Sequence, residues 1–336
     1  MMDKIPLEVR PEGLYCTAGD FFIDAWHSVP RCVVTHGHGD HARWGHQHYI
    51  AAEGSLEILK HRLGAHISIQ TLKYGQRLKI GECWLSLHPA GHILGSAQVR
   101  IETTKGVFVI SGDYKRAPDA TCEPFEVVEC DLFVTESTFA LPVYKWEQNA
   151  VVAQQIMRWW HDNQQENHPS ILFCYALGKA QRIMSLLASY TQQPVYVHGA
   201  IFPLAQIYAQ QGVTMLPFHT IGDKLKGESF AKELILAPPS AAGSPWLKRF
   251  PSFRTAAASG WMQIRGMRRR KGMDHGFVLS DHADWDALIE TIAQTKATRV
   301  LTTHGNAATL AKYLREEKNL HAQELKGLGA VDEDED

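Results

Sequence analysis

The 336-residue sequence contains no run of about 18 apolar residues, so we expect no helix that crosses a membrane. Its first residues, MMDKIPLEVRPEG, are charged and include no apolar segment, so they do not predict a secretory signal peptide. The formal net charge is only -2, which excludes binding of nucleic acid through the overall charge and leaves that task to a local basic patch. We therefore expect a cytoplasmic protein with no membrane partner.

Cysteine is also scarce, with six residues that are scattered and form no CxxC pair. Most of them lie in apolar segments such as RCVVTH and ILFCYAL, which is typical of buried, reduced thiols. The stretch GKAQ lacks the G-x-x-x-x-G-K-[ST] pattern of a P-loop, so ATP binding is not expected.

Short apolar runs dominate residues 1–142 and predict a β-rich region. A hairpin is predicted where Lys105 and Gly106 separate two alternating runs, AQVRIETT and VFVISGD. After residue 142, strand-like runs alternate with helical ones, as in WEQNAVVAQQIMRWWHDN followed by SILFCYAL. This alternation is typical of βαβ units and a parallel sheet, so the sequence predicts an α/β protein.

Metal-binding side chains crowd the segment VVTHGHGDHA, where a short apolar run ends. Three histidines and one aspartate fall within six residues, and glycines between them relax the backbone; they are His36, His38, Asp40 and His41. Imidazole nitrogens and a carboxylate together suit zinc or a similar divalent ion. A polar loop with chance histidines is the alternative, and the H-x-H-x-D-H spacing after a strand argues against it.

One loop cannot supply two metal sites, and further candidate ligands follow three later strand-like runs. These are His92 in HPAGHILGS, Asp113 in FVISGDYKR and His304 in RVLTTHGN. Each site would keep an open position for a water. We predict two sites bridged by Asp113, one with His36, His38 and His92 and the other with Asp40, His41 and His304.

The series HGHGDH, AGHILGS, SGDY and TTHG resembles the motifs of the metallo-β-lactamase superfamily. Asp24 in FFIDAW resembles the aspartate of its first motif, which implies that it orients a metal-binding residue. The segments TESTF, ALGKAQ and SDHADW are similar to the β-CASP nuclease branch. This resemblance implies that Glu136 supports His282, which would contact the scissile phosphate or protonate the leaving oxygen. The predicted catalytic residues are therefore Asp40, Glu136 and His282.

The resemblance also implies a fold, an αββα sandwich with an inserted β-CASP α/β domain. Residues 1–142 and 276–336 would form the metallo-β-lactamase domain, and residues 143–275 the inserted domain. Two divalent ions are expected as cofactors, with zinc favoured by the ligand set and manganese as the alternative.

The block SGWMQIRGMRRRKGMDHGFVLSDHADWDAL resembles the C-terminal part of the bacterial DNA ligase-associated exonucleases, and the resemblance extends over nearly the whole chain. It implies an exonuclease that acts on single-stranded or free-ended DNA in DNA repair. It also implies a functional association with an ATP-dependent DNA ligase and a helicase. The residues predicted to bind nucleic acid are Lys179, Arg265, Arg268, Arg269, Arg270 and Lys271.

Other functions stay open at this point. Eukaryotic DNA-processing β-CASP enzymes often have valine where His304 stands, and histidine there is typical of RNA-processing enzymes. The main alternative is therefore an RNA-processing endo- or exoribonuclease of the β-CASP type. A small-molecule hydrolase would not need the inserted segment, and an inactive nucleic-acid-binding subunit would be expected to have lost metal ligands.

Overall fold

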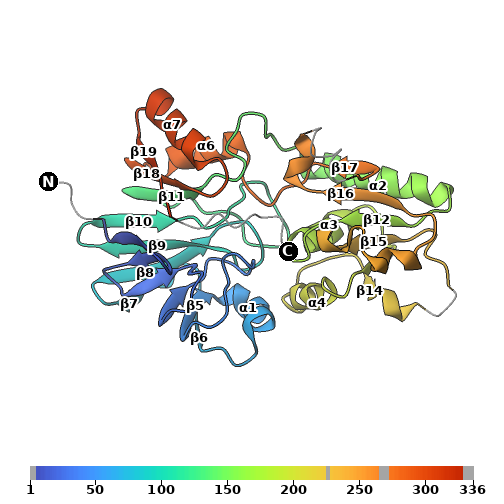
Figure 1. Cartoon of the computed structure of the whole chain (residues 1–336), viewed down its shortest axis with the longest axis horizontal. Helices are drawn as coiled ribbons and strands as arrows, with labels where there is room; N and C mark the ends of the chain where they lie inside the picture. Colours follow the sequence, from blue (N-terminus) through green and yellow to red (C-terminus); the bar gives the residue numbers. More distant parts are fainter. Residues whose placement is uncertain (1–4, 225–227, 265–271, 328–336) are drawn as a thin grey trace. The chain divides into compact units, whose positions relative to one another are not determined.

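The computed structural model describes residues 5–224, 228–264 and 272–327, and these form two compact units (Figure 1). The first unit is formed by Met1–Lys145 together with His282–Glu333, and the second by Trp146–Asp281. The predicted nucleic-acid contacts at Arg265, Arg268, Arg269, Arg270 and Lys271 lie outside the described residues.

Both unit boundaries fall a few residues later than the sequence predicted. The second unit begins at Trp146 rather than at residue 143, and it ends at Asp281 rather than at residue 275. Strand β17 (His275–Phe277) pairs in parallel with β16 (Arg254–Ala258) of the second unit. Phe277 and Leu279 are buried in the core of that unit. The segment that leads to His282 is therefore part of the second unit, because its strand and its apolar side chains are bound there.

Two sheets face each other in the first unit. In spatial order, the first sheet contains β1 (Leu7–Arg10), β2 (Gly13–Cys16), β3 (Phe21–Ile23), β4 (Arg31–Val33), β5 (His48–Ala52) and β6 (Ile69–Leu72). The second contains β19 (His321–Glu324), β18 (Arg299–Thr303), β11 (Leu132–Glu136), β10 (Gly106–Ile110), β9 (Ala97–Thr103), β8 (Cys83–Pro89) and β7 (Leu78–Ile80). Apolar side chains of both sheets, such as Val33 and Val99, share one buried core. The predicted hairpin is confirmed, since Thr103 pairs with Gly106.

Helices cover the outer faces of these sheets (Figure 1). Helices α6 (Trp285–Gln294) and α7 (Ala307–Lys318) pack on the second sheet, where Leu288 and Leu310 join Phe133 in a buried cluster. Helix α1 (Leu56–Leu63) packs on the first sheet, where Leu59 joins Tyr49. The layer order helix, sheet, sheet, helix confirms the predicted αββα sandwich.

The second unit contains a six-stranded parallel sheet, as predicted from the alternation of strand-like and helical runs. Its spatial order is β14 (Phe218–Thr220), β13 (Val195–Val197), β15 (Leu234–Ala237), β12 (Ser170–Phe173), β16 and β17. One face carries the helices α2 (Asn149–Gln165), α3 (Lys179–Leu187) and α4 (Phe202–Gln210). Short 3-10 turns, which include Pro245–Arg249 and Gly260–Gln263, pack on the other face. None of the helices in the described ranges has the length and apolar character needed to cross a membrane.

Candidate metal centre

Four loops of the first unit bring the predicted metal ligands to one place. The HGHGDH loop follows β4 of the first sheet, whereas His92, Asp113 and His304 follow strands β8, β10 and β18 of the second. The backbone N–H of Ala97 donates to the carbonyl of Thr35 at 2.8 Å, which ties the HGHGDH loop to the second sheet. Gly112 permits this close approach: its φ is +56°, and a Cβ there would lie 2.7 Å from Cβ of Thr35.

Three imidazoles form one side of the centre, which we call the imidazole half: His36, His38 and His92. The Nδ1 atom of His38 lies 3.1 Å from Nε2 of His36 and 3.1 Å from Nε2 of His92. The Oδ2 atom of Asp113 lies 3.4 Å from Nε2 of His36. Ligand atoms around a tetrahedral zinc are about 3.4 Å apart, because Zn–N bonds are about 2.1 Å long. The spacing and chemistry of these atoms therefore fit a bound divalent ion.

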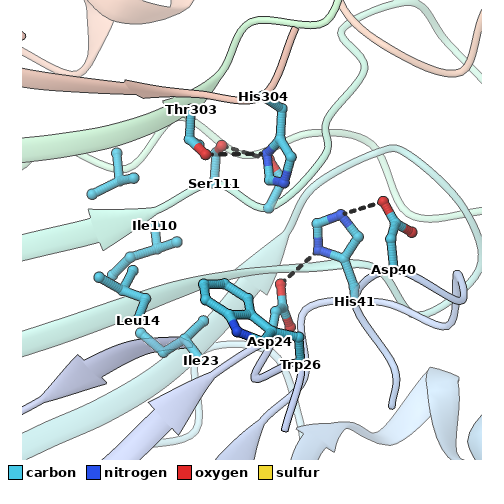
Figure 2. Close-up of a pocket in the computed structure, with 12 residues that line it drawn as sticks. Leu14, Ile23, Asp24, Trp26, Asp40, His41, Ile110, Ser111, Thr303 and His304 are labelled. Carbon is cyan, nitrogen blue, oxygen red and sulfur yellow. Dashed lines mark hydrogen bonds and ion pairs between the residues drawn. The ribbon is translucent and has the colours of Figure 1, made fainter. Parts of the chain in front are cut away.

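The other side, which we call the carboxylate half, contains Asp40, His41 and His304. Nε2 of His41 lies 3.4 Å from Oδ2 of Asp40 and 3.5 Å from Oδ2 of Asp113. The same Asp113 oxygen therefore faces a nitrogen of each half. Figure 2 shows His41 between Asp24 and Asp40, with His304 beside it.

His304 differs from the other six predicted ligands. Those six take part in groups whose ligand atoms all lie within 4.8 Å of one another, and within the described chain His304 joins no such group. Its ring centroid lies 5.4 Å from that of His41. Its backbone φ of 56° is in the left-handed region, which is uncommon for histidine. The structure thus brings His304 to the centre, and its role as a ligand stays a prediction.

Asp24 orients His41 of the carboxylate half through hydrogen bonds. Its Oδ2 accepts hydrogen bonds from Nδ1 of His41 at 2.7 Å and from the hydroxyl of Thr35 at 2.6 Å. Its Oδ1 accepts the backbone N–H of Thr35 at 2.8 Å. With its Nδ1 proton directed at Asp24, His41 presents Nε2 to the centre. The sequence interpretation missed Thr35, although its position directly before His36 was a usable signal.

The two halves have opposite electrostatic surroundings. Burial lowers the pKa of His92 well below its usual range, and the neighbouring imidazoles of His36, His282 and His38 lower it further. Burial acts in the same direction on His41, but the carboxylates of Asp40, Asp113 and Asp24 outweigh it and raise the pKa of His41 well above its usual range. His92 is therefore a neutral imidazole at neutral pH, while His41 in the metal-free protein carries a proton.

A second constellation adjoins the imidazole half. Nδ1 of His282 lies 2.9 Å from Oε2 of Glu136, and Oε1 of Glu136 accepts the backbone N–H of Tyr114 at 2.7 Å. The Glu136 side chain is 1% exposed and that of His282 is 15% exposed. The ring centroids of His282 and His92 are 4.8 Å apart. The structure therefore brings together Glu136 and His282, which the resemblance pairs although they are 146 positions apart.

A small cavity lies behind the carboxylate half, with a volume of about 80 Å³. Leu14, Ile23, Ile110 and Val134 form its apolar wall, and Asp24, Asp40, His41 and His304 line its polar side (Figure 2). The cavity therefore has apolar side chains on one side and the side chains of the carboxylate half on the other.

One residue predicted to bind nucleic acid is buried within the fold. Lys179 was expected to bind nucleic acid, but its side chain is 4% exposed and its Nζ lies 2.8 Å from Oδ2 of Asp281. The same carboxylate pairs with Arg182. The sequence did not reveal this, because nothing local to ALGKAQ indicates that a carboxylate about a hundred residues later faces it.

No family model matches this chain. Several known proteins have similar sequences, and one of them matches most of the chain. A protein of Opitutus terrae named "Probable DNA ligase" is 31% identical over 315 residues, which cover 93% of this chain and 30% of that protein. "Transcription termination factor FttA" of Pyrococcus abyssi is 28% identical over 162 residues, covering 45% of this chain and 24% of the relative. The chain thus spans less than a third of the length of either relative.

These relatives are of the β-CASP branch of the metallo-β-lactamase superfamily, and the chain is similar to them. A crystal structure of a protein of unknown function from Enterococcus faecalis V583 has the same fold, with a TM-score of 0.61 at 12% identity. That match covers 89% of this chain and 80% of the other.

Proposed function

We propose that this protein is a metal-dependent exonuclease that hydrolyses phosphodiester bonds of single-stranded or free-ended DNA. One observation carries the proposal: a single oxygen of Asp113 lies 3.4 Å from Nε2 of His36 and 3.5 Å from Nε2 of His41. A carboxylate oxygen shared by two nitrogen-rich halves suits a pair of adjacent cations, and such pairs are typical of nucleases.

The residues around the centre have distinct tasks in this proposal. When bound, two divalent ions supply a water of lowered pKa and neutralise charge on the phosphoryl group. Asp24 keeps the Nε2 of His41 directed at the centre through its 2.7 Å hydrogen bond. Asp40 and Asp113 supply the negative charge that holds the cations. The ligand set favours zinc, and its carboxylates make manganese the alternative.

Glu136 and His282 would complete the reaction by giving a proton to the leaving oxygen. The buried carboxylate of Glu136 accepts the Nδ1 proton of His282, so the opposite ring nitrogen, Nε2, would be the one that transfers a proton. General acid catalysis of this kind typically contributes about 10²–10⁴-fold.

We assign the first unit as the metallo-β-lactamase domain and the second as the inserted β-CASP domain. DNA is the proposed substrate because the block before and after His282 resembles DNA ligase-associated exonucleases, and because a relative with 31% identity is named "Probable DNA ligase". The same name supports functional cooperation with an ATP-dependent DNA ligase in repair. Association with a helicase and phosphate binding by Arg265, Arg268, Arg269, Arg270 and Lys271 stay predictions.

RNA is the second candidate substrate, since His304 follows the pattern of RNA-processing enzymes. Relatives named "Endoribonuclease YSH1" and "RNase J-like protein" match parts of this chain and favour the same reading. The choice between the two polymers therefore requires a direct comparison.

The test compares the native protein with the double variant His36→Ala/Asp40→Ala and with His61→Ala as a control. His61 is exposed on α1 and away from the centre. Matched single strands of DNA and RNA would carry a label at the 5′ or the 3′ end, with zinc or manganese added. We expect stepwise shortening of DNA by the native protein and the control only. Preferential cleavage of RNA would support the ribonuclease alternative, and cleavage of neither polymer would contradict the proposal.

A further inference from the structure

A group of three buried charged side chains lies in the second unit, and the proposed chemistry makes no use of it. Nζ of Lys179 lies 2.8 Å from Oδ2 of Asp281, and Nη1 of Arg182 lies 2.8 Å from Oδ1 of the same carboxylate. Each of the three side chains is 3–4% exposed. Lys179 and Arg182 lie in the first turn of α3, while Asp281 follows β17.

Stability does not explain this arrangement well. Charged groups lose their hydration when they are buried, and well-packed apolar side chains of similar volume are often as stabilising as a buried ion pair. Buried ionic groups are best attested as devices that fix one geometry among several.

The contacts of Arg182 show which geometry is fixed. Its Nη1 also donates to the backbone carbonyl of Ser280, and its Nη2 donates to Oδ1 of Asn149 at 2.7 Å. The planar guanidinium therefore holds Ser280 by its main chain and Asp281 by its side chain, in one rigid fork. Lys179 binds the other oxygen of Asp281, which prevents rotation of that carboxylate.

The next residue in the chain is His282. On its other side, the backbone N–H of Ala283 donates to the carbonyl of Tyr114 at 2.7 Å. Tyr114 in turn donates its own N–H to Glu136, the partner of His282. The main chain is thus held immediately before and immediately after His282, and the ring meets Glu136 with little freedom.

We propose that Lys179, Arg182 and Asp281 are positioning residues that fix the imidazole of His282 against Glu136. We call the three residues the clamp. This inference rests on the role of His282 in the proposed function. The clamp touches no reacting atom, and it acts through the backbone that joins Asp281 to His282.

The kinetic test uses Asp281→Asn, Lys179→Met and a control ion pair of the same unit. The control is Lys224→Met, because Nζ of Lys224 lies 2.6 Å from Oε1 of Glu233. We expect Asp281→Asn to lower kcat by about 10²-fold with KM unchanged, since a displacement of about 1 Å in a catalytic group has an effect of this size. Lys224→Met is expected to leave both constants unchanged. If Asp281→Asn does not fold, Lys179→Met serves as the test variant. It keeps the Arg182–Asp281 ion pair and therefore disturbs the fold less.

The decisive comparison repeats these variants in a His282→Ala background. A clamp that acts through His282 has nothing left to position there, so its loss should cause no further fall in kcat. An equal fall in both backgrounds would overturn the proposal in favour of a general structural role. A kcat that is unchanged in the native background would overturn it as well.

A measurement on the metal-free protein separates this inference from the proposed function. In protein labelled with ¹⁵N-histidine, the Nδ1 proton of His282 is identified by its absence in His282→Ala. We expect this signal to shift or broaden in both clamp variants and to persist in Lys224→Met. An unchanged signal in the clamp variants would contradict the inference, whether or not the native protein cleaves DNA.

Discussion

The imidazole half and the carboxylate half of the metal centre share Asp113 but differ in the charge around their imidazoles. His92 is surrounded by other imidazoles, and its pKa is lowered by burial and by these neighbours. His41 is surrounded by three carboxylates, which raise its pKa against the effect of burial. A neutral imidazole is a metal ligand and a protonated one is not. His92 of the imidazole half is therefore ready to bind a cation, whereas His41 of the carboxylate half must first release a proton.

Replacing Asp113 should have the largest effect on metal content and cleavage, because Asp113 contacts both halves of the centre. We expect Asp113→Asn to lose both bound ions and to reduce cleavage to the level of a blank. Metal content by inductively coupled plasma mass spectrometry measures the first effect. Asp131→Asn is a suitable control, since Asp131 accepts the N–H of Val107 at the base of the hairpin, away from the centre. Two ions retained in Asp113→Asn would rule out a bridging role.

Replacing His282 should affect the reaction but neither half of the metal centre. We expect His282→Ala to lower kcat by about 10²–10⁴-fold, the usual range for a lost general acid, with both ions still bound. Glu136→Gln should show a smaller loss in the same direction, because the amide still accepts the Nδ1 proton without the negative charge. A loss of metal in His282→Ala would show that His282 is itself a ligand.

Replacing Asp24 should weaken metal binding in the carboxylate half but not in the imidazole half. Asp24→Asn removes the charge behind His41, and such changes typically cost about 10–100-fold in metal affinity or activity. We expect the loss in the carboxylate half only, seen as weaker binding of one ion of the two in a calorimetric titration. Asp20→Asn is a matched control, since both aspartates have a positive φ, 51° for Asp20 and 46° for Asp24. Equal weakening of both ions would remove the distinction between the halves.

The smallest expected effect is a difference in pH dependence between the two binding steps. The raised pKa of His41 means that its proton must leave before the carboxylate half binds an ion, so affinity there should rise with pH. One coupled proton corresponds to about a tenfold change per pH unit, up to the pKa of His41. The first step, at the imidazole half, should depend less on pH, because the lowered pKa of His92 leaves that imidazole neutral. Titrations at several pH values check this, and parallel slopes for the two steps would contradict it.

The elements that the sequence predicted well are those specified by local pattern. The H-x-H-x-D-H segment, the strand ends before His92 and Asp113, and the alternation of strands and helices after residue 142 all follow from short-range periodicity. Periodicity gives the ends of elements, so it also indicated that His304 follows a strand; the structure places its ring beside that of His41. The pairing of Glu136 with His282 needed the resemblance to β-CASP nucleases, because nothing local joins positions so far apart.

Long-range polar contacts are the part that the sequence did not reveal. Lys179 was predicted to bind nucleic acid, but the fold buries it against Asp281. The late boundary of the second unit has the same origin, since β17 is fixed by its partner strand β16 rather than by its own composition. Thr35 was missed because its hydroxyl acts through Asp24, a residue 11 positions earlier.

The most direct test of the two-half centre is a crystal structure with anomalous data collected above and below the zinc absorption edge. We expect two peaks about 3.5–4 Å apart, the separation typical of two-metal sites. One peak should lie among His36, His38 and His92, the other should lie beside Asp40 and His41, and both should contact Asp113. A single peak, or two peaks that Asp113 does not bridge, would contradict the central claim.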